Sequence, residues 1–179
     1  MAERAPRKLD AQALWGHALR ALGARACSIA ELRQKLLDRA QRAEDVPEVL
    51  ARLKQYGYLD DRRFAEGFSA ARLENQGFGK GRVLRDLRRR RVAPRLAEEA
   101  VQAVYGDTDE VRLIEEYLRR KFRNTPLETH LAEPRHLAAV YRRLRGAGFS
   151  TGNIMRVLKQ YAGEAGWLES GEETEEGQS

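Results

Sequence analysis

The chain has 179 residues, 42% of them hydrophobic and 34% charged, which allows thin cores along its length but not one large core. No run approaches the roughly 18 apolar residues of a membrane span, and the first residues lack the apolar stretch of a signal peptide, so we expect a cytoplasmic protein with no membrane contact. The one cysteine, Cys27, excludes an intramolecular disulfide and is expected to be a small buried side chain.

Positive charge gathers in the body of the chain. The formal net charge is +6, but no Lys or Arg follows Lys159 and six glutamates do, so the residues up to Lys159 carry +12. A body this basic indicates a polyanionic partner, with nucleic acid the first candidate. We expect the basic N-terminus (residues 1–9) and the acidic tail (residues 164–179) to be disordered.

Residues 10–59 predict three short helices. Apolar residues recur at helical spacing from Asp10 and stop at Gly23. The sequence Ser28-Ile-Ala-Glu31 is typical of a capping box, in which the serine accepts an N3 amide and the glutamate reaches back to the cap. A third apolar stripe, from Val46 to Leu53, ends at Tyr56-Gly57.

Residues 60–106 repeat this cycle. The pair Asp60-Asp61 stands directly before a helix, so we interpret it as N-capping rather than as a metal or acid–base site. That helix breaks at Gly77–Gly79, and a second runs through four consecutive arginines. Pro94 begins a third helix, because proline suits the first helical position.

Residues 107–163 form the third cycle. Val111, Ile114 and Leu118 mark its first helix, and the segment Asn124–Arg135, with two prolines, predicts a long loop. A second helix ends at Gly146, and Ser150 is expected to cap the last one.

An internal repeat supports this division. A single offset carries six apolar positions of the second cycle onto six of the third: Val83 to Val140, Leu87 to Leu144, Val92 to Phe149, Ala97 to Ile154, Ala100 to Val157 and Val101 to Leu158. The sequence therefore predicts an all-α array of three tandem three-helix repeats, and strands are nowhere signalled.

The arginine-rich helix is the candidate interaction surface. Arg82, Arg85 and Arg89 share one helical face, while Val83 and Leu87 face the core. Arginine forks bind phosphates or carboxylates, although a solvated helix face would have the same composition. We assign to the partner-binding surface Arg72, Lys80, Arg82, Arg85, Arg88, Arg89, Arg142 and Arg143.

The remaining motifs favour structural roles. Tyr56, Tyr58, Phe64 and Phe68 could stack on bases, but their spacing favours core positions. Gly79-Lys80-Gly81 resembles a phosphate loop only weakly, because no strand precedes it. The histidines lack metal-ligand spacing and no catalytic constellation occurs, so we expect no enzyme, no cofactor and no metal.

The stretch from Tyr58 to Val92 resembles the RecX family of recombination regulators. The matching residues are Tyr58-Leu59-Asp60-Asp61, Arg63-Phe64-Ala65, Phe68, Arg72, Gly79, Arg82-Val83 and Leu87-Arg88, with Ser28, Glu31 and Leu32 before them and Gly148-Phe149-Ser150 and Ile154 after them. The family often has proline where this chain has Lys80, and Lys-Gly where it has Arg90-Arg91, which strengthens the charge and leaves the turn less rigid.

The resemblance implies an elongated, curved protein that acts as a monomer in recombination, repair and the SOS response. It implies binding to RecA filaments on single-stranded DNA and modulation, usually inhibition, of ATPase, strand exchange and coprotease activity. Whether DNA is bound through the filament or directly stays open. The alternatives are a free-standing nucleic-acid-binding protein with helix-turn-helix-like units and a scaffold for another protein.

Overall fold

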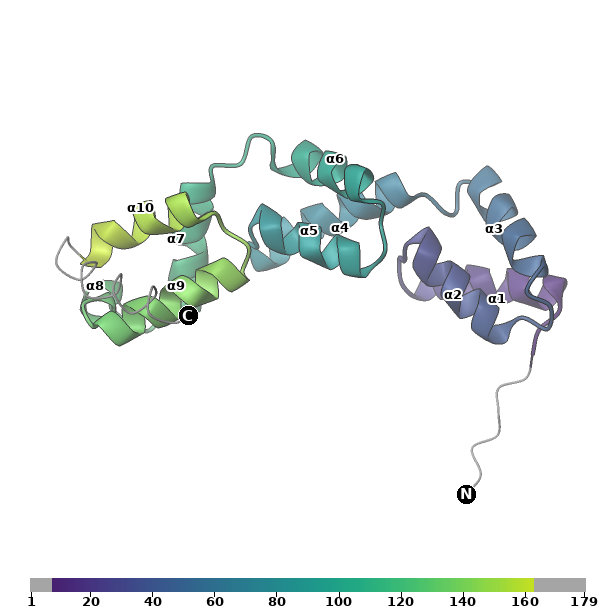
Figure 1. Ribbon diagram of the computed structural model, residues 1–179, viewed down its shortest axis with the longest axis horizontal. Coiled ribbons are helices and arrows are strands. Elements are labelled where there is room, and N and C mark those ends of the chain that lie inside the picture. Colours follow the sequence, from purple (N-terminus) through teal and green to yellow (C-terminus); the bar gives the residue numbers. More distant parts are fainter. Residues whose placement is uncertain (1–7, 163–179) are drawn as a thin grey trace, which may run out of the picture. The chain divides into compact units, whose positions relative to one another are not determined.

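The computed structural model describes residues 8–162, and within them the chain is all-α (Figure 1). Ten helices form in this range: α1 (Ala11–Ala24), α2 (Ile29–Arg39), α3 (Asp45–Gln55), α4 (Asp61–Gln76), α5 (Lys80–Arg89), α6 (Pro94–Tyr105), α7 (Glu110–Lys121), α8 (Leu127–Leu131), α9 (Pro134–Gly146) and α10 (Thr151–Ala162). The predicted all-α fold of helical repeats is confirmed.

The predicted disordered tail lies outside the described residues, as does the N-terminus up to residue 7. Leu9 already has a fixed partner, because its amide donates to the Arg39 carbonyl and its carbonyl accepts from Gln41, both at 2.8 Å. Leu9, which precedes the predicted first helix, is therefore held in place by backbone hydrogen bonds.

The chain divides into two compact units. Unit 1 lies within Met1–Phe68 and Asp86–Ala100, and unit 2 within Ser69–Arg85 and Val101–Ser179. Helices α4, α5 and α6 thus contribute residues to both units, and the contacts of each unit are described separately below.

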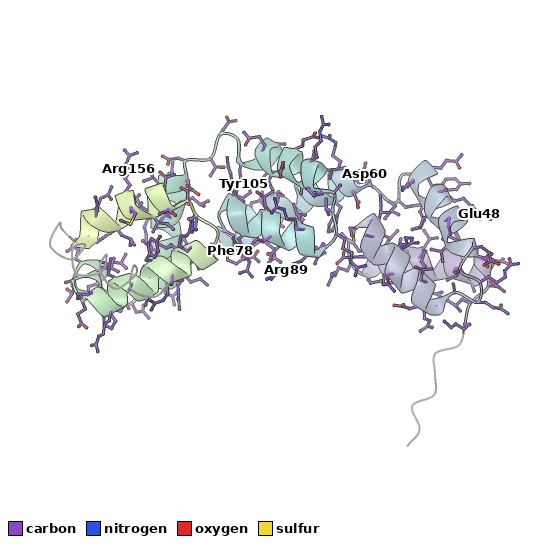
Figure 2. The ribbon with its side chains drawn as sticks, viewed as in Figure 1. Glu48, Asp60, Phe78, Arg89, Tyr105 and Arg156 are labelled. Carbon is purple, nitrogen blue, oxygen red and sulfur yellow. The ribbon has the colours of Figure 1, made fainter. Side chains whose placement is uncertain are left out.

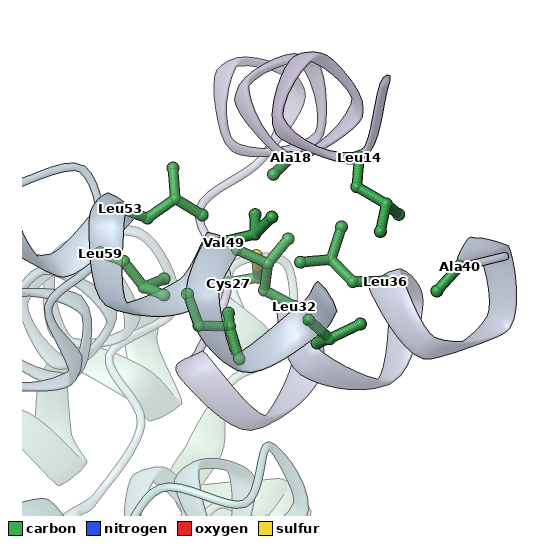
Figure 3. Close-up of a cluster of buried hydrophobic side chains, with 11 residues drawn as sticks. Leu14, Ala18, Cys27, Leu32, Leu36, Ala40, Val49, Leu53 and Leu59 are labelled. Atoms are coloured by element: carbon green, nitrogen blue, oxygen red, sulfur yellow. The ribbon is translucent and has the colours of Figure 1, made fainter. Parts of the chain in front are cut away.

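Helices α1, α2 and α3 enclose the core of unit 1 (Figure 3). Leu14, Leu32, Leu36 and Leu53 are fully buried there, and each such leucine contributes about 1.5–3 kcal/mol relative to exposure. Cys27 is 4% exposed, as predicted, and burial raises the pKa of its thiol. A buried thiol of raised pKa is a poor nucleophile, so its role is packing.

The capping box of α2 also joins the first repeat to the second. The Glu31 amide donates to Ser28 Oγ and the Ser28 amide to the Glu31 carboxylate, both at 3.1 Å, as predicted. In addition, Ser28 Oγ donates to the Arg90 carbonyl at 2.6 Å. One serine side chain therefore serves a helix end and an inter-repeat contact.

Unit 2 contains the third repeat and the α4–α5 turn. Tyr117 and Phe149 pack edge to face with ring centroids 5.5 Å apart, next to the buried Ile114, Leu118 and Leu144. Glu110 of α7 accepts hydrogen bonds from the amide and hydroxyl of Ser150, the residue before α10. The start of α10 is therefore fixed by a carboxylate from α7.

The predicted loop Asn124–Arg135 is wrong. Helix α8 occupies Leu127–Leu131, with Pro126 at its N-cap, and α9 begins at Pro134. Leu131 is fully buried, so burial of a leucine stabilises this single turn. The prolines begin helices here rather than exclude them, because the first helical positions need no amide donor.

Backbone contacts join the α4–α5 turn to the α9–α10 turn inside unit 2. The Gly79 amide donates to the Ala147 carbonyl at 2.9 Å, and the Gly81 amide to the Gly148 carbonyl at 3.0 Å. A Cβ on Gly79 would lie 2.4 Å from the Gly148 oxygen, so only glycine permits this approach. The Gly79 and Gly81 amides thus already donate to carbonyls of the α9–α10 turn. They are not available to bind a phosphate, so the segment is not a phosphate loop.

The internal repeat is visible in the burial pattern. The twelve residues matched by the single offset, from Val83 and Val140 to Val101 and Leu158, are all buried, none more than 3% exposed. The sequence periodicity therefore identified equivalent core positions.

Candidate functional site

Two of the predicted arginines flank one aromatic ring in unit 2. The guanidinium carbons of Arg82 and Arg72 lie 5.4 and 6.0 Å from the centre of the Phe78 ring. Arg72 also donates to Gln76 Oε1 at 3.0 Å. Both arginines are half-buried, so they pack against the α4–α5 turn and also give it positive charge.

Tyr105 fixes the same turn from α6. Its hydroxyl donates to the Phe78 carbonyl at 2.8 Å, and burial raises the pKa of Tyr105 to about 12. The phenol is thus an uncharged donor at any physiological pH.

Arg85 is anchored on the third repeat. Its Nη2 donates to the Gly146 carbonyl at 3.0 Å, at the C-terminal end of α9, where the helix dipole favours a cation. Arg142 and Arg143 lie on the last turns of α9, and Arg143 stands 5.7 Å from the Phe122 ring centre. Unit 2 therefore brings Arg85 to the helix that carries Arg142 and Arg143.

The four consecutive arginines have four different environments in unit 1. Arg88 pairs with Glu98 at 3.4 Å, and the exposed Arg89 points away from the end of α5 (Figure 2). Arg90 is half-buried, 4.9 Å from the Phe68 ring centre and 3.5 Å from the Glu31 carboxylate. Arg91 has a φ of 59° and terminates the helix.

Arg90 is the residue whose role the sequence did not reveal. Its side chain lies over Phe68 and against Glu31, and its carbonyl accepts from Ser28, so it holds the first repeat to the second. At least one member of the run of arginines therefore makes internal contacts. No sequence signal pointed to this contact, because helical periodicity does not connect the arginine run with the capping box at Ser28.

Asp60 and Asp61 divide the capping between two helices. Asp60 accepts from the Arg62 and Arg63 amides at 2.8 and 3.1 Å, which confirms it as the cap of α4. Asp61 instead accepts from the Ile29 amide at 2.8 Å, at the start of α2. Burial raises the pKa of Asp61, and the Ile29 hydrogen bond opposes that rise.

The prediction of Tyr56 and Tyr58 as core residues is wrong. Their side chains are 62% and 55% exposed, and Leu59, 4% exposed, takes the core position. Phe64 and Phe68 are half-buried and contact Arg90. The family-like aromatic stretch therefore contains half-buried and solvent-facing rings.

Of the eight predicted cations, three have neither an ion pair nor a side-chain hydrogen bond or ring contact among residues 8–162: Lys80, Arg89 and Arg142. Such cations can exchange water for phosphate or carboxylate oxygens without first breaking an internal contact. They are the members of the predicted surface best suited to a partner.

Other kinds of site find no support in the part of the chain that the structure describes. No group of three or more His, Cys, Asp or Glu side chains could hold a metal ion there. The rings of His130 and His136 stack with centroids 4.2 Å apart, but no further ligand joins them. None of the helices in this part is both long and apolar enough to cross a membrane.

The middle repeat matches a known family model. Residues 60–101, which span α4, α5 and most of α6, match the model described as the second three-helix domain of RecX. The chain is 36% identical over 156 residues to the regulatory protein RecX of Deinococcus radiodurans, covering 87% of this chain and 72% of that protein. It is 31% identical over 143 residues to its counterpart in Trichlorobacter lovleyi, covering 80% and 92%.

Solved structures show the same fold. The crystal structure of RecX from Lactobacillus salivarius has a TM-score of 0.65 at 17% identity, covering 84% of this chain and 96% of that one. A crystal structure of regulatory protein RecX has a TM-score of 0.64 at 19% identity, covering 82% and 70%.

Proposed function

The chain belongs to the RecX family of regulatory proteins, and on that premise we propose that it regulates the RecA recombinase. It binds RecA filaments formed on single-stranded DNA and inhibits their ATPase, strand-exchange and coprotease activities, as a cytoplasmic monomer and without chemistry of its own. The observation that carries this proposal is the 31% identity to a regulatory protein over 92% of that protein's length.

The contact is electrostatic and centred on the second and third repeats. Lys80 and Arg142 in unit 2 and Arg89 in unit 1 supply cations without internal ion pairs, whereas Arg72, Arg82, Arg85 and Arg88 make internal contacts within their own units. We assign the repeats to residues 10–59, 60–106 and 107–163, and they contact neighbouring recombinase subunits. A repeated unit suits a partner that is itself a repeating filament.

The test is the DNA-dependent ATPase of RecA, measured with the protein well below stoichiometry and at two salt concentrations. The wild type should inhibit, and less so at the higher salt, because released counterions weaken charge-based binding. The variant Lys80→Gln/Arg89→Gln/Arg142→Gln should lose most of this inhibition while it keeps its helicity by circular dichroism.

A matched control removes the same charge elsewhere. Arg20, Arg33 and Lys35 are exposed residues of α1 and α2, and their combined replacement by glutamine should leave inhibition intact. Equal loss in both triple variants would mean that net charge alone matters. No ATPase effect at any dose, together with tight binding to naked DNA, would instead establish the free-standing DNA-binding protein.

A further inference from the structure

A row of three aromatic rings, two of them exposed, lies on unit 1 outside the arginine-rich helix α5. Trp15 of α1 meets Tyr56 edge to face with ring centroids 5.8 Å apart, and Tyr56 lies 6.4 Å from Tyr58. Tyr56 and Tyr58 are the exposed large hydrophobic residues of the described chain. We call Trp15, Tyr56 and Tyr58 the aromatic row.

A glycine turn holds Tyr56 and Tyr58 outside the core. Gly57 stands between the two tyrosines with a φ of 72°, a conformation that glycine adopts without strain. The buried Leu59 then returns the chain to the core. The turn thus places Tyr56 and Tyr58 at the surface and the neighbouring Leu59 in the core.

Cations surround the aromatic row. The Arg52 guanidinium lies 4.6 Å from the Trp15 ring centre, and Arg63 donates to the Gly57 carbonyl at 2.5 Å. None of Arg52, Arg63 and Lys54 of α3 forms an ion pair within residues 8–162, although Lys54 interacts electrostatically with Asp61 and opposes the rise in its pKa. Arg52 and Arg63 therefore stand at the row, and the Lys54 backbone contacts the same turn, where its carbonyl accepts from the Gly57 amide at 2.9 Å.

We propose that the aromatic row is a stacking site for the bases of single-stranded nucleic acid, with Arg52, Lys54 and Arg63 as its phosphate contacts. Unpaired bases expose π-faces that stack on tyrosine, and neighbouring cations track the backbone. None of the large aliphatic residues described here is exposed, so the row offers aromatic ring faces for stacking rather than a broad apolar patch.

One acidic group refines this assignment. Glu48 lines a shallow hollow together with Trp15, Val49 and Arg52. A carboxylate there repels phosphate but accepts hydrogen bonds from base amino groups. The Glu48 edge of the hollow is therefore the base side of the site, and Arg52 and the turn at Gly57, which Arg63 holds, are the phosphate side.

Trp15 provides a direct readout, because the sequence contains two tryptophans and replacement of Trp167 by phenylalanine leaves it alone. In that background an oligothymidylate should change the Trp15 emission and bind with shallow salt dependence, since only three cations take part. The double variant Tyr56→Ala/Tyr58→Ala should bind about tenfold more weakly for each tyrosine, and Tyr56→Phe/Tyr58→Phe should bind normally.

The proposal depends on the proposed function for its choice of ligand, but the assay contains no recombinase, so the two can fail separately. Unchanged emission at saturating oligothymidylate, or full affinity in the double alanine variant, would overturn it. So would equal binding to a duplex of the same length, whose bases are already stacked. An emission change only with RecA filaments would assign the row to protein docking and also overturn it.

Discussion

Replacement of Gly79 by alanine should destabilise unit 2 through a purely backbone clash. The new Cβ would lie 2.4 Å from the Gly148 oxygen and 2.7 Å from the Phe149 amide nitrogen, where ordinary contact begins at 3.4 Å. The two turns must therefore separate by about 1 Å, which breaks or stretches the hydrogen bonds to Ala147 and Gly148.

The size of the effect follows from those two bonds. Each contributes about 0.5–1.5 kcal/mol, so their loss costs about 2 kcal/mol. Alanine offsets about 0.4–1 kcal/mol of this by restricting the unfolded chain. The net expectation is a destabilisation of about 1–2 kcal/mol, or a fall of about 0.5–1 M in the urea midpoint at an m-value near 2 kcal/mol/M.

Urea unfolding followed by circular dichroism at 222 nm measures this change, and hydrogen exchange of the Gly79 and Gly81 amides locates it. Gly152→Ala is the matched control, because a Cβ there meets nothing within 4 Å. The control should be as stable as the wild type or slightly more so. A Gly79→Ala protein with wild-type stability and unchanged amide protection would refute the close-contact reasoning.

Three further changes test the other contacts by urea unfolding. Tyr105→Phe should cost about 1 kcal/mol, because it leaves the Phe78 carbonyl without its donor. The wild type, unlike this variant, should lose stability as pH rises from 10 toward the Tyr105 pKa of about 12. Asp61→Asn keeps an acceptor for the Ile29 amide, so the variant should be at least as stable as the wild type at pH 7. Because the pKa of Asp61 is raised by burial, the wild type should lose stability as pH rises above 3.8, and the variant should lack this loss. Ser28→Ala should cost about 1–2 kcal/mol, because a cap and an inter-repeat hydrogen bond disappear together. Unchanged midpoints or pH profiles would contradict the corresponding assignments.

Local periodicity was sufficient for nine of the ten helices in residues 8–162 and for most of the core. The capping box at Ser28, the twelve repeat-related core positions and the buried Cys27 all followed from spacing and residue type. These features depend on neighbours within one or two helical turns, where apolar pattern and capping chemistry act. The short helix α8 was missed because a single turn has too few residues to show a period.

Long-range partners were not accessible from the sequence. Spacing could not show that Arg90 contacts Glu31, that Asp61 accepts from Ile29, or that Gly79 meets Gly148. The side on which a residue lies was also ambiguous near turns, as with the exposed Tyr58 beside the buried Leu59. The arginine surface itself stays a prediction, and replacement of Lys80, Arg89 and Arg142 tests it.

The contact between the α4–α5 and α9–α10 turns is made by main-chain atoms of Gly79, Gly81, Ala147 and Gly148. Main-chain donors and acceptors are the same for every residue type except proline, so this joint makes few demands on the side chains around it. This joint of unit 2 therefore tolerates replacement of the surrounding side chains, provided that Gly79, Gly81 and Gly148 keep their place, because a Cβ on any of them would meet main-chain atoms at 3.0 Å or less.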